Sequence, residues 1–372
     1  MKAVQVDCFT GNSGLTDYSV SLSRALLPHA DIELVTAQSL LPRFSNLGFK
    51  TKQLFRRSRH YLFDLPKFVF YTLRQKPDGV LFQGPLKVPM LEGAISVLFR
   101  CFGIRTALTI HDVLPHYPRA WSRFEFAWFY QRFNRLIVHS SAAQEAVRDL
   151  GVKRPLLVVP HGAYDLFRLS GVSRAQARQN LGAGNIADGD FVALFFGHLE
   201  PRKGLMEFIE VAQQMRNAPG MKFVIAGGND MASHGSEYAK AVSDAKALPN
   251  VLVRDERIPF EEVENFFAAS DVVALPYREG TTSGVLKLAI AFGIPIVASR
   301  VGDLPEEVPV GGGVLFDAGE GLANHLHEAL LTVREQHPLF VNAMKGAAGN
   351  SDWAPIAKAY AEFIFSEEAG YA

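Results

Sequence analysis

Short apolar runs alternate with longer amphipathic stretches along most of the chain. An apolar run of about 4 to 8 residues is typical of a strand in a buried parallel sheet, and apolar residues three or four positions apart indicate a helix. In the first half the predicted strands are 3–7, 32–36, 80–83, 106–111, 136–139 and 156–159. In the second half they are 191–196, 222–226, 251–253, 272–275 and 296–298. This alternation predicts an α/β fold with two Rossmann-like, doubly wound domains.

The segment 162–190 separates the two series of strands. It has scattered Gly, Ser and Asp and no strand pattern, so we expect the interdomain connection there. A length of 372 residues also suggests two domains, because a typical domain has about 150 residues. We predict domains at 1–165 and 166–351. Ligands of such sheets bind beyond the carboxyl ends of the strands, so the chemistry is expected in the loops that follow them.

Charge and cysteine content narrow the class of protein. The chain has 38 Lys and Arg residues and 38 Asp and Glu residues, so its formal net charge is zero. Residues 1–165 contain 21 Lys and Arg but only 12 Asp and Glu, so this half has a net charge of +9 and the rest of the chain −9. A globally basic nucleic-acid binder is excluded, and we expect no nucleic-acid partner. Cys8 and Cys101 lie far apart in apolar contexts, which favours a reducing compartment. No apolar run of about 18 residues could span a bilayer.

The loop after strand 191–196 carries two adjacent cations before an amphipathic helix. Arg202 and Lys203 lie in the sequence PRKG, and the helix pattern follows at once. A helix N-terminus attracts anions through its free N–H groups and its dipole, and neighbouring cations strengthen a phosphate site. The alternative for PRKG by itself is a solvated turn.

A second loop of this type follows strand 272–275. Its glycines and small hydroxyl residues leave backbone N–H groups accessible at a helix start, while Glu279 can accept hydrogen bonds from vicinal sugar hydroxyls. The alternative for Glu279 is a helix-capping carboxylate. The candidate phosphate-binding residues of this loop are Thr281, Thr282, Ser283 and Gly284.

Several motifs occur in a fixed order across the second half: GHLEPRKG, AGG at 226–228, ASDVV at 269–273, LPYREG, AFGIPIVAS and VGDLPEEV. In this order they resemble the retaining family-4 glycosyltransferases of GT-B fold. The resemblance implies that two domains face each other across a cleft and hold a nucleotide-sugar donor, with no metal and no other cofactor. It implies that Lys203 and residues 282–284 bind the diphosphate, with Arg202 beside them, and that Glu279 contacts the donor sugar.

Two positions depart from the family pattern. His198 occupies a position on the donor side where the family usually has Arg, and Lys287 occupies the position of a second Glu that contacts the ribose. A lysine ammonium cannot accept a hydrogen bond from a hydroxyl. We therefore expect Lys287 to approach a phosphate or to pair with a nearby carboxylate.

The first half has its own candidates. Gly14 lies in the loop after the opening strand, and His111 and Asp112 end the strand at 106–111. The resemblance places the glycine loop near the donor pyrophosphate and His111 with Asp112 on the acceptor side. The alternatives are a plain turn for the loop and a structural role for the histidine. We interpret His139 and His161 as mainly structural.

Two segments interleave aromatic residues with cations. Residues 50–76 contain eight Lys and Arg against one Asp, and residues 119–135 carry four Arg against one Glu. Such a mixture suits an anionic membrane surface, where rings lie at headgroup level and cations meet lipid phosphates. The alternative is an amphipathic helix that covers a sheet.

The resulting hypothesis is a metal-independent retaining hexosyltransferase. It would move a sugar from a nucleotide diphosphate to a glycan or lipid-linked acceptor in cell-envelope or exopolysaccharide biosynthesis, in the cytoplasm and peripherally on the inner face of the membrane. The alternative is a catalytically silent GT-B subunit that binds a sugar nucleotide or a partner. We also expect a helix over 352–372, which by the resemblance crosses back onto the first domain.

Overall fold

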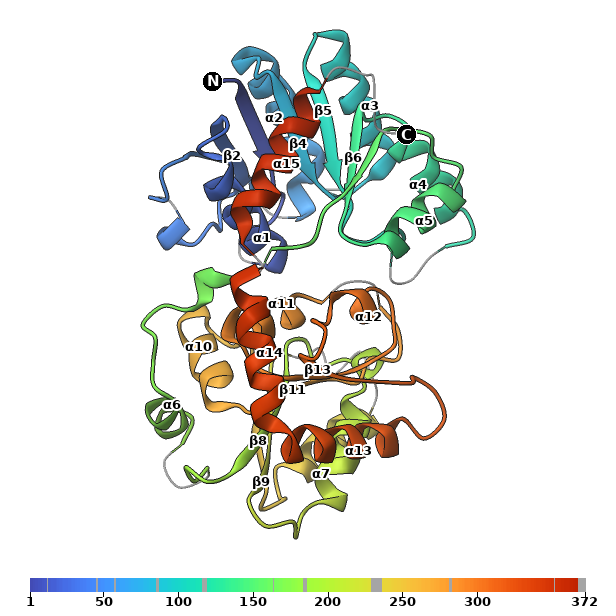
Figure 1. Ribbon diagram of the computed structural model, residues 1–372. Coiled ribbons are helices and arrows are strands. Elements are labelled where there is room, and N and C mark those ends of the chain that lie inside the picture. The colour runs from blue at the N-terminus through green and yellow to red at the C-terminus, as the bar shows by residue number, and fades with distance from the viewer. Residues whose placement is uncertain are drawn as a thin grey trace. The chain divides into compact units, whose positions relative to one another are not determined.

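The structure, a computed structural model, describes residues 1–11, 13–44, 46–56, 58–84, 87–115, 119–162, 164–182, 186–228, 236–280, 283–350 and 352–366. Backbone contacts divide the chain into two compact units (Figure 1). Unit 1 contains Met1–Gly162 and Asp352–Ala372, and unit 2 contains Ala163–Ser351. The last helix of the chain is thus part of unit 1.

Unit 1 is built on a parallel sheet of seven strands in the order β3-β2-β1-β4-β5-β6-β7. Val6 of the central strand is paired with Leu34 on one side and Leu81 on the other. The strands are β1 (Ala3–Asp7), β2 (Asp31–Ala37), β3 (Lys50–Phe55), β4 (Gly79–Gln83), β5 (Arg105–Thr109), β6 (Arg135–Val138) and β7 (Leu156–Val158).

Helices cover both faces of this sheet. Alternate strand residues pack with α2 (Tyr61–Gln75), α3 (Pro89–Cys101), α4 (Ser122–Tyr130) and α5 (Ser141–Asp149) in one aromatic-rich core. Helices α1 (Gly14–Leu26) and α15 (Trp353–Phe365) pack against each other (Figure 1). Tyr18 of α1 and Tyr360 of α15 share a hydrogen bond of 2.7 Å between their hydroxyls.

Unit 2 repeats the design with six parallel strands in the order β10-β9-β8-β11-β12-β13. The strands are β8 (Phe191–Phe196), β9 (Met221–Ala226), β10 (Val251–Arg254), β11 (Val272–Leu275), β12 (Ile296–Ser299) and β13 (Gly313–Phe316). Helices α7 (Leu205–Gln214), α9 (Ser236–Ala245) and α13 (Leu322–Glu335) share one core with alternate strand residues. The other helices are α6 (Arg174–Asn180), α10 (Phe260–Ala269), α11 (Gly284–Phe292), α12 (Leu304–Glu307) and α14 (His337–Asn350).

The α/β fold of two Rossmann-like units is confirmed, and every predicted strand is present within a few residues of its expected bounds. His111 lies two residues beyond β5 and not in the strand. Two strands, β3 and β13, were not predicted. The boundary between the units lies after Gly162, and α6 lies within the segment 162–190 where we expected the interdomain connection and packs on α10 of unit 2.

Residues 50–76 do not form the single basic face that the sequence indicated. Lys50 lies in the edge strand β3 and pairs with Asp31, with 3.7 Å between Nζ and Oδ2. Arg56 binds the buried Asp64, with 2.8 Å between Nε and Oδ1, and its backbone N–H also donates to that carboxylate. Among the described residues of this segment, the helix α2 offers a candidate surface for a membrane.

The strand order reverses direction between β8 and β11 in unit 2, since β9 and β10 lie on one side and β12 and β13 on the other. A crevice at such a switch point, beyond the carboxyl ends of the strands, is where open parallel sheets bind ligands. The loops that flank it are those after β8 and β11, which carry Lys203 and Glu279.

Candidate functional site

The loop after β8 leads through a short 3-10 helix, Pro201–Lys203, into α7. Gly204 joins the two with a left-handed φ of 73° that few other residues adopt without strain. The loop also contacts the end of β9, because an added Cβ at Gly227 would lie only 1.6 Å from the carbonyl oxygen of Gly197. The backbone therefore fixes where the Lys203 side chain begins.

The Lys203 ammonium lies beside the switch point. A Cβ built on Gly197 would be 3.5 Å from Nζ of Lys203 and 3.2 Å from Cγ2 of Val285, in the first turn of α11. Burial lowers the pKa of Lys203 to about 8, opposed by the nearby Glu200 and assisted by Arg202. In the described part of the chain no carboxylate lies within ion-pair distance of this ammonium. Lys203 is thus a partly desolvated cation ready to bind an anion.

Arg202 and His198 both contact Glu200. The Arg202 guanidinium makes a short ion pair with the Glu200 carboxylate, and both side chains are largely buried. His198 is half exposed, with Nε2 3.8 Å from Oε1 of Glu200. Glu200 therefore holds the Arg202 side chain in place and neutralises part of its charge.

The loop after β11 is anchored by hydroxyl groups. The hydroxyls of Tyr277 and Ser283 are 3.0 Å apart, and Oγ of Ser299 at the end of β12 donates to the Tyr277 carbonyl at 2.6 Å. Between these anchors the Glu279 side chain is exposed and has no hydrogen bond or ion pair within the described residues. It does not cap α11, because Ser283 is the N-cap and accepts from the Leu286 N–H.

The two loops are in direct contact. A Cβ at Gly204 would lie 1.9 Å from the carbonyl oxygen of Pro276, so only glycine permits this approach. The Arg278 N–H donates to the Arg202 carbonyl at 2.7 Å, and a Cβ at Gly280 would lie 3.5 Å from Nη1 of Arg202. The structure thus brings Arg202 and Lys203 together with the loop that carries Glu279, as the sequence-based hypothesis requires.

Helix α11 begins at this meeting point. A Cβ built on its first residue, Gly284, would lie 3.4 Å from Cε2 of Tyr164. The N–H groups of its first turn have no acceptor within the helix. Ser283 and Gly284 are therefore placed as a phosphate site would need them. Thr281 and Thr282, which we also expected there, lie outside the described residues.

Lys287 is paired with a carboxylate. Its Nζ lies 2.7 Å from Oε1 of Glu307 at the end of α12, and each side chain is only 5% exposed. Of the two contacts expected for Lys287, the structure has the one with a carboxylate. No sequence pattern pointed to this partner, which lies 20 positions further along the chain.

In unit 1, the segments after β5, β6 and β7 bring three histidines together around Tyr18 of α1. The ring centroid of Tyr18 lies 4.7 Å from that of His111, 5.3 Å from that of His139 and 4.6 Å from that of His161. Nδ1 of His139 contacts the Val159 carbonyl at 3.1 Å. Sequence reasoning interpreted His139 and His161 separately and missed the cluster, although each follows a predicted strand.

His111 contacts a polar side chain at the end of β4. Its Nε2 lies 3.2 Å from Oε1 of Gln83, at the end of β4. Because an amide oxygen only accepts, this contact assigns the proton to Nε2 and leaves Nδ1 as an acceptor. Burial, and then the neighbouring His139, hold the pKa of His111 well below its usual range. The imidazole is therefore neutral at physiological pH.

The remaining candidates of unit 1 lie at the same edge of the sheet. Gly14 is the first residue of α1, after the N-cap Ser13, and a Cβ on it would meet nothing within 4 Å. The capping box is closed by Thr16, whose N–H donates to Ser13 Oγ at 3.4 Å. Asp112 follows His111, and its carbonyl accepts from the Tyr130 hydroxyl at 3.4 Å.

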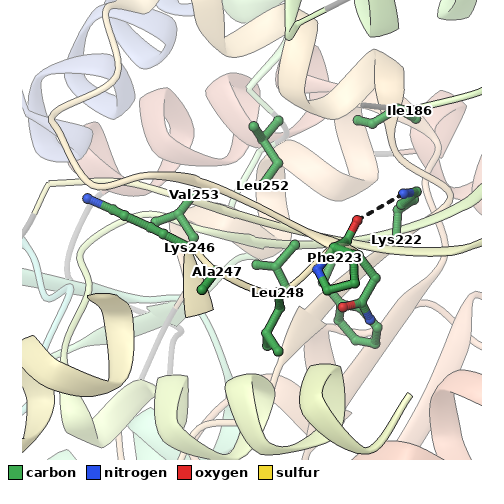
Figure 2. Close-up of a pocket in the computed structure, with 11 residues that line it drawn as sticks. Ile186, Lys222, Phe223, Lys246, Ala247, Leu248, Leu252 and Val253 are labelled. Carbon is green, nitrogen blue, oxygen red and sulfur yellow. Dashed lines mark hydrogen bonds between the residues drawn. The ribbon is translucent and has the colours of Figure 1, made fainter. Parts of the chain in front are cut away.

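A pocket at the other edge of the unit 2 sheet contains none of the candidate residues (Figure 2). Its two cations are engaged: Nζ of Lys222 donates to the Pro249 carbonyl at 3.2 Å, and Lys246 pairs with Asp255 at 2.7 Å. Its lining residues are Ile186, Lys222, Phe223 and residues 246–253. We therefore assign no role to this pocket.

Among the residues that the structure describes, no group of three or more His, Cys, Asp or Glu side chains is placed to share a metal ion. Among the helices described here, none combines the length and the apolar character needed to cross a membrane.

Two Rossmann-like units in one chain, each built on a parallel sheet, are typical of the GT-B class of folds. Solved structures of that class match almost the whole chain. HepE from Anabaena in complex with UDP-glucose has a TM-score of 0.75 at 19% identity, covering 97% of this chain and 99% of that chain. Sucrose-phosphate synthase from Thermosynechococcus elongatus has a TM-score of 0.74 at 17% identity, covering 97% and 98%.

Family models identify both halves. Residues 12–164 match the model described as Glycosyltransferase Family 4, and residues 190–334 match Glycosyl transferases group 1. The chain therefore belongs to the family-4 glycosyltransferases. A D-inositol 3-phosphate glycosyltransferase from Mycobacterium sp. (strain KMS) is 30% identical over 208 residues, which are 54% of this chain and 45% of that protein. The chain thus spans about half the length of such relatives.

Proposed function

We propose that this protein transfers a hexose from a nucleotide diphosphate to a hydroxyl of a glycan or lipid-linked acceptor. The observation that carries the proposal is the contact between the two loops of unit 2. It brings Arg202, the start of α11 and the Lys203 ammonium, which has no ion pair among the described residues, to one switch point. A diphosphate fits this arrangement, because cations and free helix N–H groups both stabilise it.

The donor sugar would then lie near Glu279. This carboxylate is exposed and unpartnered in the described chain, so its acceptor positions are available to vicinal hydroxyls. Hydrogen bonds of Tyr277, Ser283 and Ser299 anchor the described residues on either side of it.

The chemistry that we propose is retaining and uses no metal. The acceptor oxygen forms a bond to the anomeric carbon on the face from which the diphosphate leaves, and a phosphate oxygen takes the acceptor proton. Charge that develops on the leaving diphosphate is stabilised by Lys203, Arg202 and the N–H groups near Ser283. No group of the chain has to change its protonation state in this step.

The acceptor would be bound by unit 1. Neutral His111 offers Nδ1 as an acceptor for a hydroxyl proton, and the contact with Gln83 fixes the ring. His139 and His161 pack around the same tyrosine and support that orientation. We place the reaction in the cytoplasm, on the inner face of the membrane, in envelope or exopolysaccharide biosynthesis.

Removal of the Lys203 ammonium tests the proposal. Lys203→Ala should lower the rate of sugar transfer by about a hundredfold or more, because a preorganised cation at a developing charge contributes several kcal/mol. Release of nucleoside diphosphate from UDP-, GDP- and ADP-sugars is the measurement, with an envelope lipid extract as acceptor. Lys222→Ala is the matched control, since this lysine lies at the opposite edge of the same sheet. Turnover of Lys203→Ala within threefold of the parent would refute the assignment.

The silent-subunit alternative predicts a different result. The motivating observation is that Lys287, paired with Glu307, stands where the family has its ribose-binding carboxylate. Such a subunit would bind a nucleoside diphosphate, seen as a rise in melting temperature, without any transfer or donor hydrolysis. Binding together with turnover that Lys203→Ala abolishes would exclude it.

A further inference from the structure

Exposed apolar side chains concentrate on one part of unit 1. Of the 17 large hydrophobic side chains that are exposed in the described chain, ten belong to α2, α3 and α4 or to residues at their ends. They are Leu62, Phe63, Phe70, Met90, Leu91, Val97, Leu98, Phe102, Trp121 and Phe124. A soluble monomer seldom exposes so many large apolar side chains in one region, which indicates a binding surface.

The outer face of α2 alternates rings and cations. Phe63 and Phe70 are 70% and 68% exposed, and Lys67 and Arg74 follow them at one-turn spacing on the same face. The inner face of the helix is an ordinary core face, with Phe68 fully buried. The helix is therefore apolar on both sides. On its outer face Arg74 and Lys67 lie among exposed rings, and Nζ of Lys67 is 3.8 Å from Oδ1 of Asp64.

The two neighbouring helices continue this pattern. The exposed positions of α3 are almost entirely apolar and include Leu91 and Leu98. At the start of α4, Phe124 is 72% exposed, Trp121 lies under the Arg119 guanidinium at 5.6 Å, and Arg123 is exposed.

Two of the three acidic side chains on these helices are turned away from this surface. Asp64 of α2 and Glu92 of α3 are fully buried, where Asp64 binds Arg56 and Glu92 accepts from the Tyr61 hydroxyl at 2.6 Å. The third, Glu125 of α4, is half-buried. The fully exposed charges on the three helices as described are therefore positive.

The three outer faces form one continuous layer. Helices α2 and α3 are joined by the Tyr61–Glu92 hydrogen bond and by the Phe68 and Phe99 rings, whose centroids are 5.8 Å apart. Helices α3 and α4 approach closely at Gly93, where an added Cβ would lie 2.6 Å from the Trp128 ring. We define the docking layer as the exposed side chains of α2, α3 and α4.

The first turns of these helices lie at the carboxyl edge of the sheet, because each helix follows a parallel strand. Phe63, Leu91 and Phe124 are first-turn residues. His111 follows β5 at the same edge. The apolar end of the docking layer is thus on the side of unit 1 that we propose binds the acceptor.

We propose that the docking layer binds an anionic lipid bilayer and holds the histidine cluster next to lipid-linked acceptors. The exposed aromatic rings match the polarity of the headgroup region. The cations, with no fully exposed acidic residue among those described on these helices, match the charge of anionic lipid. The choice of a lipid-linked acceptor rests on the proposed function, whereas membrane binding itself does not. The face differs from the one that the sequence indicated, because it includes α3 and leaves out β3 and Arg56.

Vesicle co-sedimentation of the full chain tests the layer. The parent should bind vesicles of phosphatidylcholine with phosphatidylglycerol and bind pure phosphatidylcholine much more weakly. Arg74→Gln with Arg123→Gln should weaken binding to the anionic vesicles by about thirtyfold, at about fivefold for each removed charge. Phe63→Ser with Phe124→Ser should remove the component that persists in 1 M salt, which screens charge but not apolar burial.

Control variants distinguish binding by the docking layer from nonspecific hydrophobic adsorption and from effects on catalysis. Leu339→Ser with Leu331→Ser removes two exposed hydrophobic side chains of unit 2 and should leave vesicle binding unchanged. Donor hydrolysis in solution should also be unchanged in the layer variants, which keeps this inference distinct from the proposed function. Equal recovery of the parent in the supernatant with and without anionic vesicles would overturn the proposal. The proposal would also be overturned if the parent protein were a dimer and the layer variants dissociated it without changing vesicle binding.

Discussion

The depressed pKa of Lys203 predicts that nucleotide affinity falls between pH 7 and pH 9. With a pKa of about 8, the ammonium form makes up about nine tenths of the free protein at pH 7 and about one tenth at pH 9. If only this form binds a diphosphate, the apparent dissociation constant rises about tenfold over that range, equivalent to about 1.4 kcal/mol. The sign follows from linkage, since bound diphosphate stabilises the ammonium and the complex takes up a proton.

Isothermal titration calorimetry of UDP, GDP and ADP at pH 7, 8 and 9 measures this effect. Titrations at pH 8 in two buffers of different ionisation enthalpy should show an uptake of about half a proton for the nucleotide that binds. Lys203→Arg is the control, because arginine stays charged throughout this range and its profile should be flat. A flat profile for the parent, or the same slope in Lys203→Arg, would refute the reasoning.

Four other variants or conditions test separate parts of the structure. Glu279→Gln should reduce sugar transfer about a hundredfold while the protein remains folded, and a normal rate and donor Michaelis constant would exclude a role in donor binding. Gly227→Ala should destabilise unit 2 by about 3 kcal/mol in urea titrations, because its Cβ would meet the Gly197 carbonyl; an unchanged midpoint would contradict the close approach. Arg178→Met should cost about 1 to 3 kcal/mol, because the carbonyls of Asp188 and Asp190 lose their donor while Asp271 keeps its ion pair with Arg174, and an unchanged unfolding free energy in calorimetry would be inconsistent with those hydrogen bonds. The free energy of unfolding should fall as the pH drops below about 6.5, since His111 takes up a proton in the unfolded chain before it does so in the folded one, and His111→Asn should reduce that slope.

Most strands could be predicted because they are buried on both faces and appear as apolar runs. β3 could not, because it is an edge strand whose sequence KTKQLF is mostly polar and exposed. Helix α6 was missed for a related reason. It has no apolar face and is held by the buried Arg178, which binds Asp271 and the carbonyls of Asp188 and Asp190.

The candidate site also contains some residues that could be placed from the sequence and others that could not. Arg202 and Lys203 could be placed from sequence because a strand, a loop and a helix follow one another without interruption. The partner of Lys287 could not, since Glu307 belongs to another helix and only the packing of α11 beside α12 brings the two side chains together. The histidine cluster likewise depends on three adjacent strands ending at one height, which the order of strands along the chain does not reveal.

Helix α15 has a consequence for how the protein is made. It is translated after the whole of unit 2, yet its residues complete unit 1: Tyr360 bonds to Tyr18 and Thr109, and Arg135 donates to the Phe363 and Ser366 carbonyls. On the ribosome, unit 2 can therefore reach its native state before unit 1 does. The apolar face of unit 1 that α15 covers stays exposed until α15 has been translated. Contacts between residues so far apart in the sequence also form slowly. Nascent chains stalled before residue 352 should accordingly recruit chaperones to the first half, and removal of α15 should impair unit 1 although it lies at the far end of the sequence.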